Sequence, residues 1–132
     1  MNIGEVSRAS GLPIKTIRYY EDMGLIAPHR QENGYRVFND HNLYKLKFLR
    51  RSRSLGFSVK ECSKLLELYD DPDRTSAQVK NITQHRLSDI ERKIEKLQVI
   101  RSALKRMVGS CRSSDDRKCA ILDSIANAEL VH

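Results

Sequence analysis

The chain has 132 residues, which is enough for one domain or two very small ones, and 39% of them are hydrophobic. Lysine and arginine number 24 against 17 aspartates and glutamates, a net charge of +7, and nearly all of this excess lies in residues 1–60. No apolar run approaches the roughly 20 residues that span a bilayer, and no signal peptide is recognisable, so we expect a cytoplasmic protein without a membrane partner. A basic half is typical of nucleic-acid-binding proteins, although a solvated charged surface has the same composition.

Two short helices joined by a tight turn are predicted in the first part of the chain. Asn2 caps a helix over residues 1–9, and Gly11 marks the turn that follows it. A second helix begins at Pro13 and ends at Gly24, with an inner stripe and a basic, aromatic outer face. This pattern is typical of a helix-turn-helix, whose second helix enters the DNA major groove, although an ordinary helical hairpin shares it. The predicted inner stripe is Ile14, Ile17 and Tyr20.

Residues 28–38 predict a β-hairpin, because Asn33-Gly34 is a strong signal for a type I′ turn. A hairpin directly after a recognition helix is a wing, and Arg36 on its second strand would reach a DNA phosphate. The alternative is a solvated turn whose aromatic side chain packs into the core.

Two further helices follow the hairpin. The first covers about residues 41–54 and carries five lysines and arginines. The second begins at Ser58, where Glu61 completes a capping box. Helical spacing then predicts an inward stripe in which Cys62 is a small core residue without chemistry of its own. The stripe consists of Cys62, Leu65, Leu66 and Tyr69.

A long helix is predicted from Ser76 to about Val108, because nothing interrupts it before Gly109. It would be about 50 Å long. Its seam alternates spacings of three and four, and so small a chain cannot bury that seam against itself. We therefore expect a homodimer through a parallel or antiparallel coiled coil, and a twofold DNA site. The seam is Leu87, Ile90, Ile94, Leu97, Arg101, Leu104 and Val108.

Two cysteines, Cys111 and Cys119, stand eight positions apart in a polar segment after the long helix. Cys119 precedes a short apolar helix, whose positive end, with nearby basic residues, favours the thiolate that binds metals. Two thiolates satisfy a soft monovalent ion such as Cu(I), but the spacing equally allows free thiols or a redox-switching disulfide. The side chains of Asp115, Asp116 and His132 could add ligands, but they lack a recognisable zinc spacing. No catalytic constellation is present, so we do not expect an enzyme.

The runs Met1–Val6, Thr16–Glu21, Gly24–Ile26 and Asn33–Arg36 resemble the MerR family of bacterial transcription regulators, and the resemblance extends over the whole chain. It implies a mainly α fold in three parts. These are a winged helix-turn-helix DNA-binding domain over 1–70, a coiled-coil dimerisation helix over 75–109, and a metal-binding loop with a short C-terminal helix over 110–132.

Within that family, the paired cysteines are similar to those of copper(I)-responsive regulators of the CueR and HmrR type. The resemblance implies that Cys111 and Cys119 bind Cu(I), or Ag(I) or Au(I), as the effector. Ser76 stands where sensors of divalent ions tend to have cysteine, and it would lie beside the metal site of the partner subunit. Arg112–Ser114 and Ala120 stand where copper regulators usually have glycine and proline.

The implied function is activation of copper-efflux genes. The dimer would occupy a promoter whose spacer is too long, and metal binding would distort the DNA so that RNA polymerase meets both promoter elements. Two alternatives stay open: a MerR-type regulator of a divalent metal or of thiol oxidation, and a coiled-coil metal- or thiol-buffering protein without a DNA target. The expected DNA contacts are Lys15, Thr16, Arg18, Tyr19, Tyr35, Arg36 and Arg53.

Overall fold

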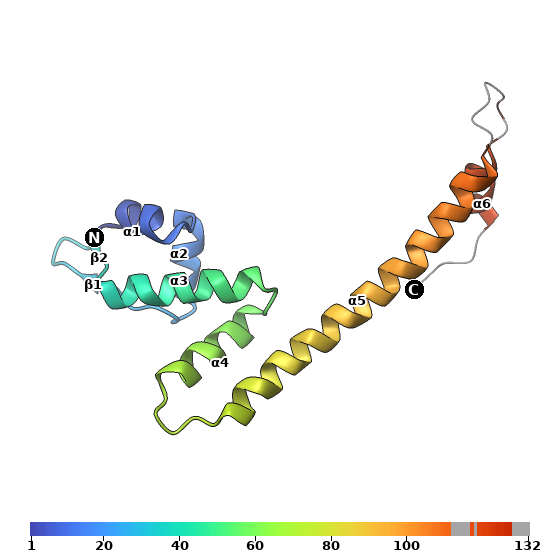
Figure 1. Cartoon of the computed structure of the whole chain (residues 1–132). Coiled ribbons are helices and arrows are strands. Elements are labelled where there is room, and N and C mark those ends of the chain that lie inside the picture. Colours follow the sequence, from blue (N-terminus) through green and yellow to red (C-terminus); the bar gives the residue numbers. More distant parts are fainter. Residues whose placement is uncertain (112–116, 118, 128–132) are drawn as a thin grey trace. The chain divides into compact units, whose positions relative to one another are not determined.

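The computed structural model describes residues 1–111, 117 and 119–127 (Figure 1). The chain divides into two units, Met1–Thr83 and Gln84–His132. The expected mainly α fold is confirmed, with one small sheet in the first unit. The elements are α1 (Ile3–Ser10), α2 (Ile14–Asp22), β1 (His29–Arg30), β2 (Arg36–Val37), α3 (Asp40–Ser54), α4 (Val59–Asp70), α5 (Ser76–Ser110) and α6 (Ala120–Asn127).

Helix ends in the first unit are set by local side-chain caps. In α1, Asn2 accepts a hydrogen bond from the Glu5 amide while the Glu5 carboxylate accepts one from the Asn2 amide. Ser58 and Glu61 form the same reciprocal pair at α4. Each such cap satisfies amides that would otherwise lack partners, and is worth about 1 kcal/mol. The caps predicted at these two positions are therefore confirmed.

The core of the first unit is formed by side chains from all four of its complete helices and from the residue after β2. Cys62, which we predicted to be a small core residue, is completely buried there. Burying each large apolar side chain contributes roughly 1.5–3 kcal/mol, so this unit has a driving force of its own. The other apolar side chains with at most 1% exposure are Val6, Ile17, Phe38, Leu46 and Leu49.

Two positions of the predicted core differ in the structure. Ile14, in the first turn of α2, is 38% exposed, because only the following turns of that helix face the core. Tyr69 is 55% exposed, and Leu68 is buried in its place. The Tyr69 ring lies on the rim instead, 5.7 Å from the rings of both Tyr44 and Phe48. A tyrosine suits such a rim because its ring covers apolar surface while its hydroxyl reaches water.

The predicted hairpin is present, but its turn differs from the type I′ turn expected from Asn33-Gly34. The strands β1 and β2 are antiparallel, with Arg30 opposite Arg36. Gln31 and Tyr35 close a three-residue loop through a main-chain hydrogen bond of 2.9 Å, and the Gly34 amide donates back to the Gln31 carbonyl. Gly34 has φ +84°, so this is the loop in which a turn is followed by one left-handed residue.

The second unit consists of the rest of α5 and of α6, and no described side chain of either helix is buried. Helix α5 runs through Gly109 to Ser110, beyond the end that we predicted, because a glycine keeps its amide and can continue a helix. The predicted seam is solvent-exposed, with Leu97 63% and Val108 67% exposed. In the part of the chain that is described, no helix has the length and hydrophobicity to cross a bilayer.

Candidate nucleic-acid interface and thiol pair

Helix α2 presents a basic, aromatic face to solvent. Its opposite face is fixed to the core by Ile17 and Tyr20, which are almost completely buried. Burial raises the pKa of the Tyr20 hydroxyl, and the nearby positive charge of Arg53 opposes this rise. Because the inner side is fixed, the predicted contact residues lie outside: Lys15, Arg18 and Tyr19 are exposed, and Thr16 is half-buried.

A surface groove of about 710 Å³ lies between the wing, the N-terminal end of α1 and one residue of α2. Arg18 from α2 lines it, as do Tyr35 and Arg36 from the hairpin. Tyr35 is 70% exposed at the edge of the loop. The structure thus brings one residue of the predicted recognition helix together with two residues of the predicted wing. Guanidinium groups and a tyrosine hydroxyl are the donors that proteins commonly direct at phosphates.

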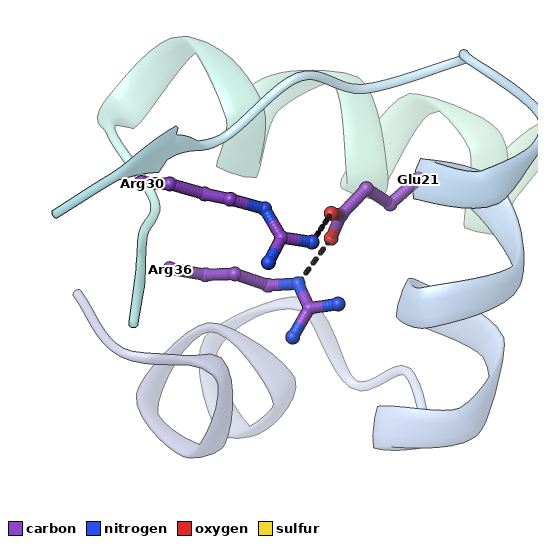
Figure 2. Close-up of polar contacts among 3 residues, drawn as sticks. All are labelled: Glu21, Arg30 and Arg36. Carbon is purple, nitrogen blue, oxygen red and sulfur yellow. Dashed lines mark hydrogen bonds and ion pairs between the residues drawn. The ribbon is translucent and has the colours of Figure 1, made fainter. Parts of the chain in front are cut away.

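A carboxylate joins α2 to both strands of the wing (Figure 2). Arg30 Nη2 donates to Glu21 Oε1 at 2.9 Å, and Arg36 Nε donates to Glu21 Oε2 at 2.5 Å. The Glu21 side chain is only 13% exposed. Sequence reasoning missed this arrangement, because the partners are nine and fifteen positions away and follow no helical or strand period. The only sequence signal for these ion pairs was a carboxylate near the end of a helix, shortly before a hairpin that carries two arginines.

Arg53 lies at the end of α3, where its Nη1 donates to the Phe57 carbonyl at 2.7 Å. This hydrogen bond satisfies a carbonyl in the turn between α3 and α4. The side chain is exposed, so a contact with DNA stays a prediction for this residue. Unlike Arg18, it is not a lining residue of the groove beside the wing.

The two thiols stand at the ends of the segment between α5 and α6. The Cys111 amide donates to the Val108 carbonyl at 3.2 Å, which continues the last turn of α5. The Cys119 carbonyl accepts the Asp123 amide at 3.1 Å, which places Cys119 directly before α6 as predicted. Both are free and half-buried.

Other residues considered for the metal site are only partly described. Arg112, Asp115, Asp116, Lys118 and His132 lie outside the described residues. Among the residues that are described, no three cysteine, histidine or acidic side chains are grouped as metal ligands would be. Ser76 is exposed and is the first residue of α5.

The third cysteine is chemically distinct from this pair. Cys62 is completely buried in α4, and its Sγ lies 3.7 Å from the Phe57 carbonyl. Burial raises the pKa of the Cys62 thiol, so it keeps its proton. A neutral, buried thiol is a poor metal ligand and a poor nucleophile.

Two family models match the chain and together cover most of it. The model described as "MerR HTH family regulatory protein" matches residues 1–68. The model described as "MerR, DNA binding" matches residues 43–107. The first match covers α1, α2 and the wing, which are the elements that build the groove.

The chain is also similar to individual proteins over nearly its full length. The HTH-type transcriptional regulator HmrR of Rhizobium leguminosarum bv. viciae is 53% identical, with 96% of this chain and 98% of that protein covered. The HTH-type transcriptional regulator CueR of Salmonella typhi is 42% identical, with 96% and 92% covered. Among solved structures, the transcription regulator PbrR691 from Ralstonia metallidurans CH34 in complex with lead(II) is 29% identical, with a TM-score of 0.83 and 95% and 98% covered.

Proposed function

The chain belongs to the MerR family of transcription regulators, and from this premise we propose that it is a dimeric, copper(I)-responsive activator of copper-efflux genes. Its class is transcription regulation and not catalysis, as its relatives are regulators. The observation that carries the proposal is the thiol pair, Cys111 and Cys119, at the two ends of the segment between α5 and α6.

The donor set supports a soft monovalent ion. Soft thiolate ligands favour Cu(I) among the common cellular ions. A complex of two thiolates with one monovalent ion has a net charge of −1. A third thiolate would add further negative charge, and Ser76 at the start of α5 cannot supply one. Ag(I) and Au(I) share this chemistry. Cys62 adds no ligand in this proposal, because it is buried in the core of the first unit.

The DNA-binding part of the proposal uses α2 and the wing. Helix α2 enters the major groove with Lys15, Thr16, Arg18 and Tyr19, while Tyr35 and Arg36 contact the phosphate backbone beside it. Arg53 is the remaining proposed contact. The concentration of positive charge in residues 1–60 supports this assignment, because phosphate contacts supply much of the affinity for DNA.

Signal transmission in this proposal depends on two copies of α5. The exposed seam of one chain packs on that of its partner, and Ser76 of the partner subunit lies beside the metal. Metal binding then changes the shape of the bound promoter DNA, which RNA polymerase reads, and the affinity for DNA changes little. An effector shifts the two states of the dimer only by its differential affinity for them.

The proposal is tested by anaerobic titration of the reduced protein with Cu(I) and Zn(II) against competing chelators. We expect tight Cu(I) binding at one ion per subunit, weak Zn(II) binding, and loss of the Cu(I) site in both Cys111→Ser and Cys119→Ser. Cys62→Ala is the matched control and should bind Cu(I) as the unaltered protein does, because Cys62 is buried away from solvent.

Other outcomes of this titration, or of a promoter assay, select the alternatives. Tighter binding of Zn(II) than of Cu(I) would replace copper by a divalent effector, and the ion named for the structurally similar PbrR691, lead(II), is also divalent. Promoter activation by an oxidant, without copper, would favour a disulfide switch between Cys111 and Cys119. Cu(I) binding that survives both serine substitutions would overturn the proposed site.

The DNA-binding surface is tested by Arg18→Ala in mobility-shift titrations at two salt concentrations. Losing one phosphate or base contact should weaken binding by about 1–3 kcal/mol, and loss of a phosphate contact should reduce the salt slope by about one. Arg106→Ala, which removes the same charge from an exposed position on α5, is the control and should change neither quantity much. Equal behaviour of the two variants would remove Arg18 from the surface.

A further inference from the structure

We propose that Glu21 is a positioning residue that fixes the wing against the recognition helix, so that both contact DNA as one rigid unit. This inference rests on the proposed DNA-binding surface and names a residue for which no contact with DNA is expected. Glu21 lies one residue before the end of α2, and its carboxylate binds Arg30 of β1 and Arg36 of β2 (Figure 2). We call these three residues the Glu21 clamp.

The hairpin needs such a group because of its own charges. Arg30 and Arg36 stand directly opposite each other in the register of β1 and β2. Two like charges at opposite positions of a strand pair repel each other and destabilise the pairing. A two-residue strand pair is also too short to be stable alone. One carboxylate oxygen on each arginine turns this repulsion into two charge-assisted hydrogen bonds.

The other supports of the hairpin act mainly on its second strand. Phe38, directly after β2, is buried in the core. Its main chain also pairs with Met1 through hydrogen bonds of 2.7 and 2.8 Å. In contrast, both residues of β1, His29 and Arg30, are exposed. The first strand therefore depends on its pairing with β2 and on the Glu21 clamp.

The burial of Glu21 makes its contribution larger than that of an ordinary surface ion pair. Exposed pairs contribute about 0–1 kcal/mol, since water and salt screen them. The Glu21 side chain is 13% exposed and Arg36 is 26% exposed, so their hydrogen bond is mostly shielded from solvent. Breaking this hydrogen bond leaves the largely buried guanidinium of Arg36 without its charged partner.

A positioning role and a purely electrostatic role predict opposite signs. A carboxylate beside a DNA-binding groove repels phosphates, so its removal strengthens DNA binding if charge is its only effect. If Glu21 holds the wing in place, its removal weakens binding despite the gain in net positive charge. The sign of the change in affinity therefore separates the two roles.

The test compares Glu21→Gln with Glu32→Gln. Both remove one negative charge, and Glu32 is an exposed residue of the hairpin loop outside the clamp. The first readout needs no DNA: amide hydrogen exchange across residues 29–37. We expect exchange there to become about tenfold faster in Glu21→Gln and to stay unchanged in Glu32→Gln, since the wing would open locally without global unfolding. Thermal unfolding of each variant shows whether the remaining fold is intact.

The second readout is affinity for promoter DNA. We expect Glu21→Gln to bind about fivefold to tenfold more weakly, which corresponds to roughly 1–1.4 kcal/mol, and Glu32→Gln to bind equally or slightly more tightly. Adding Arg30→Gln to Glu21→Gln should cause little further loss of affinity for DNA, because both substitutions break the same Glu21 clamp.

Each result has one meaning. Unchanged exchange in Glu21→Gln, or DNA binding as tight as in Glu32→Gln, would overturn the positioning role. If the unaltered protein bound no DNA while exchange rose as expected, the proposed DNA-binding surface would be wrong, and the Glu21 clamp would stand as a support of the hairpin.

Discussion

The two units of the chain are both largely helical, yet they bury their apolar side chains to very different degrees. In Met1–Thr83, short helices converge on a core that includes Phe38, Leu46 and Leu49 with at most 1% exposure. In Gln84–His132, the described helices bury no side chain, and leucines and valines along α5 are half to two-thirds exposed. A regular apolar seam on a long exposed helix is stable in water only when something covers it.

The two units therefore derive their stability from different sources. The first unit buries its apolar side chains within one chain, so its fold is a property of the monomer. The second carries the seam that we propose to pair with a second copy, so its stability depends on protein concentration. The paired thiols of Cys111 and Cys119 lie in that second unit, whereas the proposed DNA contacts lie in the first.

The largest effect is expected for Leu104→Glu in the seam of α5, where Leu104 is 53% exposed. In a twofold dimer the substitution removes two buried leucines and adds two charges. Losing the two leucines alone costs about 4 kcal/mol, or about a thousandfold in the dissociation constant. Sedimentation equilibrium should therefore show monomers at concentrations where we expect the unaltered protein to be dimeric.

Ser102→Glu provides the control for that substitution, because it adds the same charge at an exposed position of α5 outside the seam. It should leave the dissociation constant nearly unchanged. If Leu104→Glu dimerised as well as Ser102→Glu, the seam would not be the subunit interface, and the contrast between the units would need another explanation.

A smaller but still large effect is expected for Leu46→Ala in the core of the first unit. Leu46 is completely buried, so the cavity and the lost burial should lower the free energy of unfolding by about 3 kcal/mol. All five tyrosines lie in residues 1–83, and the chain has no tryptophan. Tyrosine fluorescence during urea unfolding therefore reports on this unit selectively. Leu122→Ala, at a 65% exposed position of α6, should not change the urea midpoint of that unfolding transition.

The smallest effect concerns the cysteines. Cys111 and Cys119 are half-buried, whereas Cys62 is completely buried and its pKa is raised by that burial. Iodoacetamide reacts with the thiolate, so at pH 7.5 we expect Cys62 to be labelled at least about tenfold more slowly than the pair. Mass spectrometry of digested protein measures this ratio. The ratio should fall towards one in denaturant, and Cys62 labelling should rise as pH approaches its raised pKa.

Much of this molecule was predictable from short-range chemistry. The capping pairs of α1 and α4 involve residues three apart, and Gly11 ends α1 with φ +74° as expected of a left-handed residue. The period of the α5 seam and the position of Cys119 before α6 also follow from neighbouring residues alone. Membership of the MerR family, suspected from short runs in the first unit, is confirmed by the family models and by near full-length relatives.

Residues within a few positions of one another therefore encode the helices, the caps of α1 and α4, and the apolar period of α5, although α5 runs past its predicted end to Ser110. Three features arise only in the folded chain: Glu21 binds two arginines of the wing, Leu68 and not Tyr69 is buried, and Arg53 donates to the Phe57 carbonyl. These contacts depend on how separate elements pack together. No local sequence period encodes a contact between separate elements. The stabilising energy of such a contact comes from burial and charge pairing, which exist only once the chain has folded.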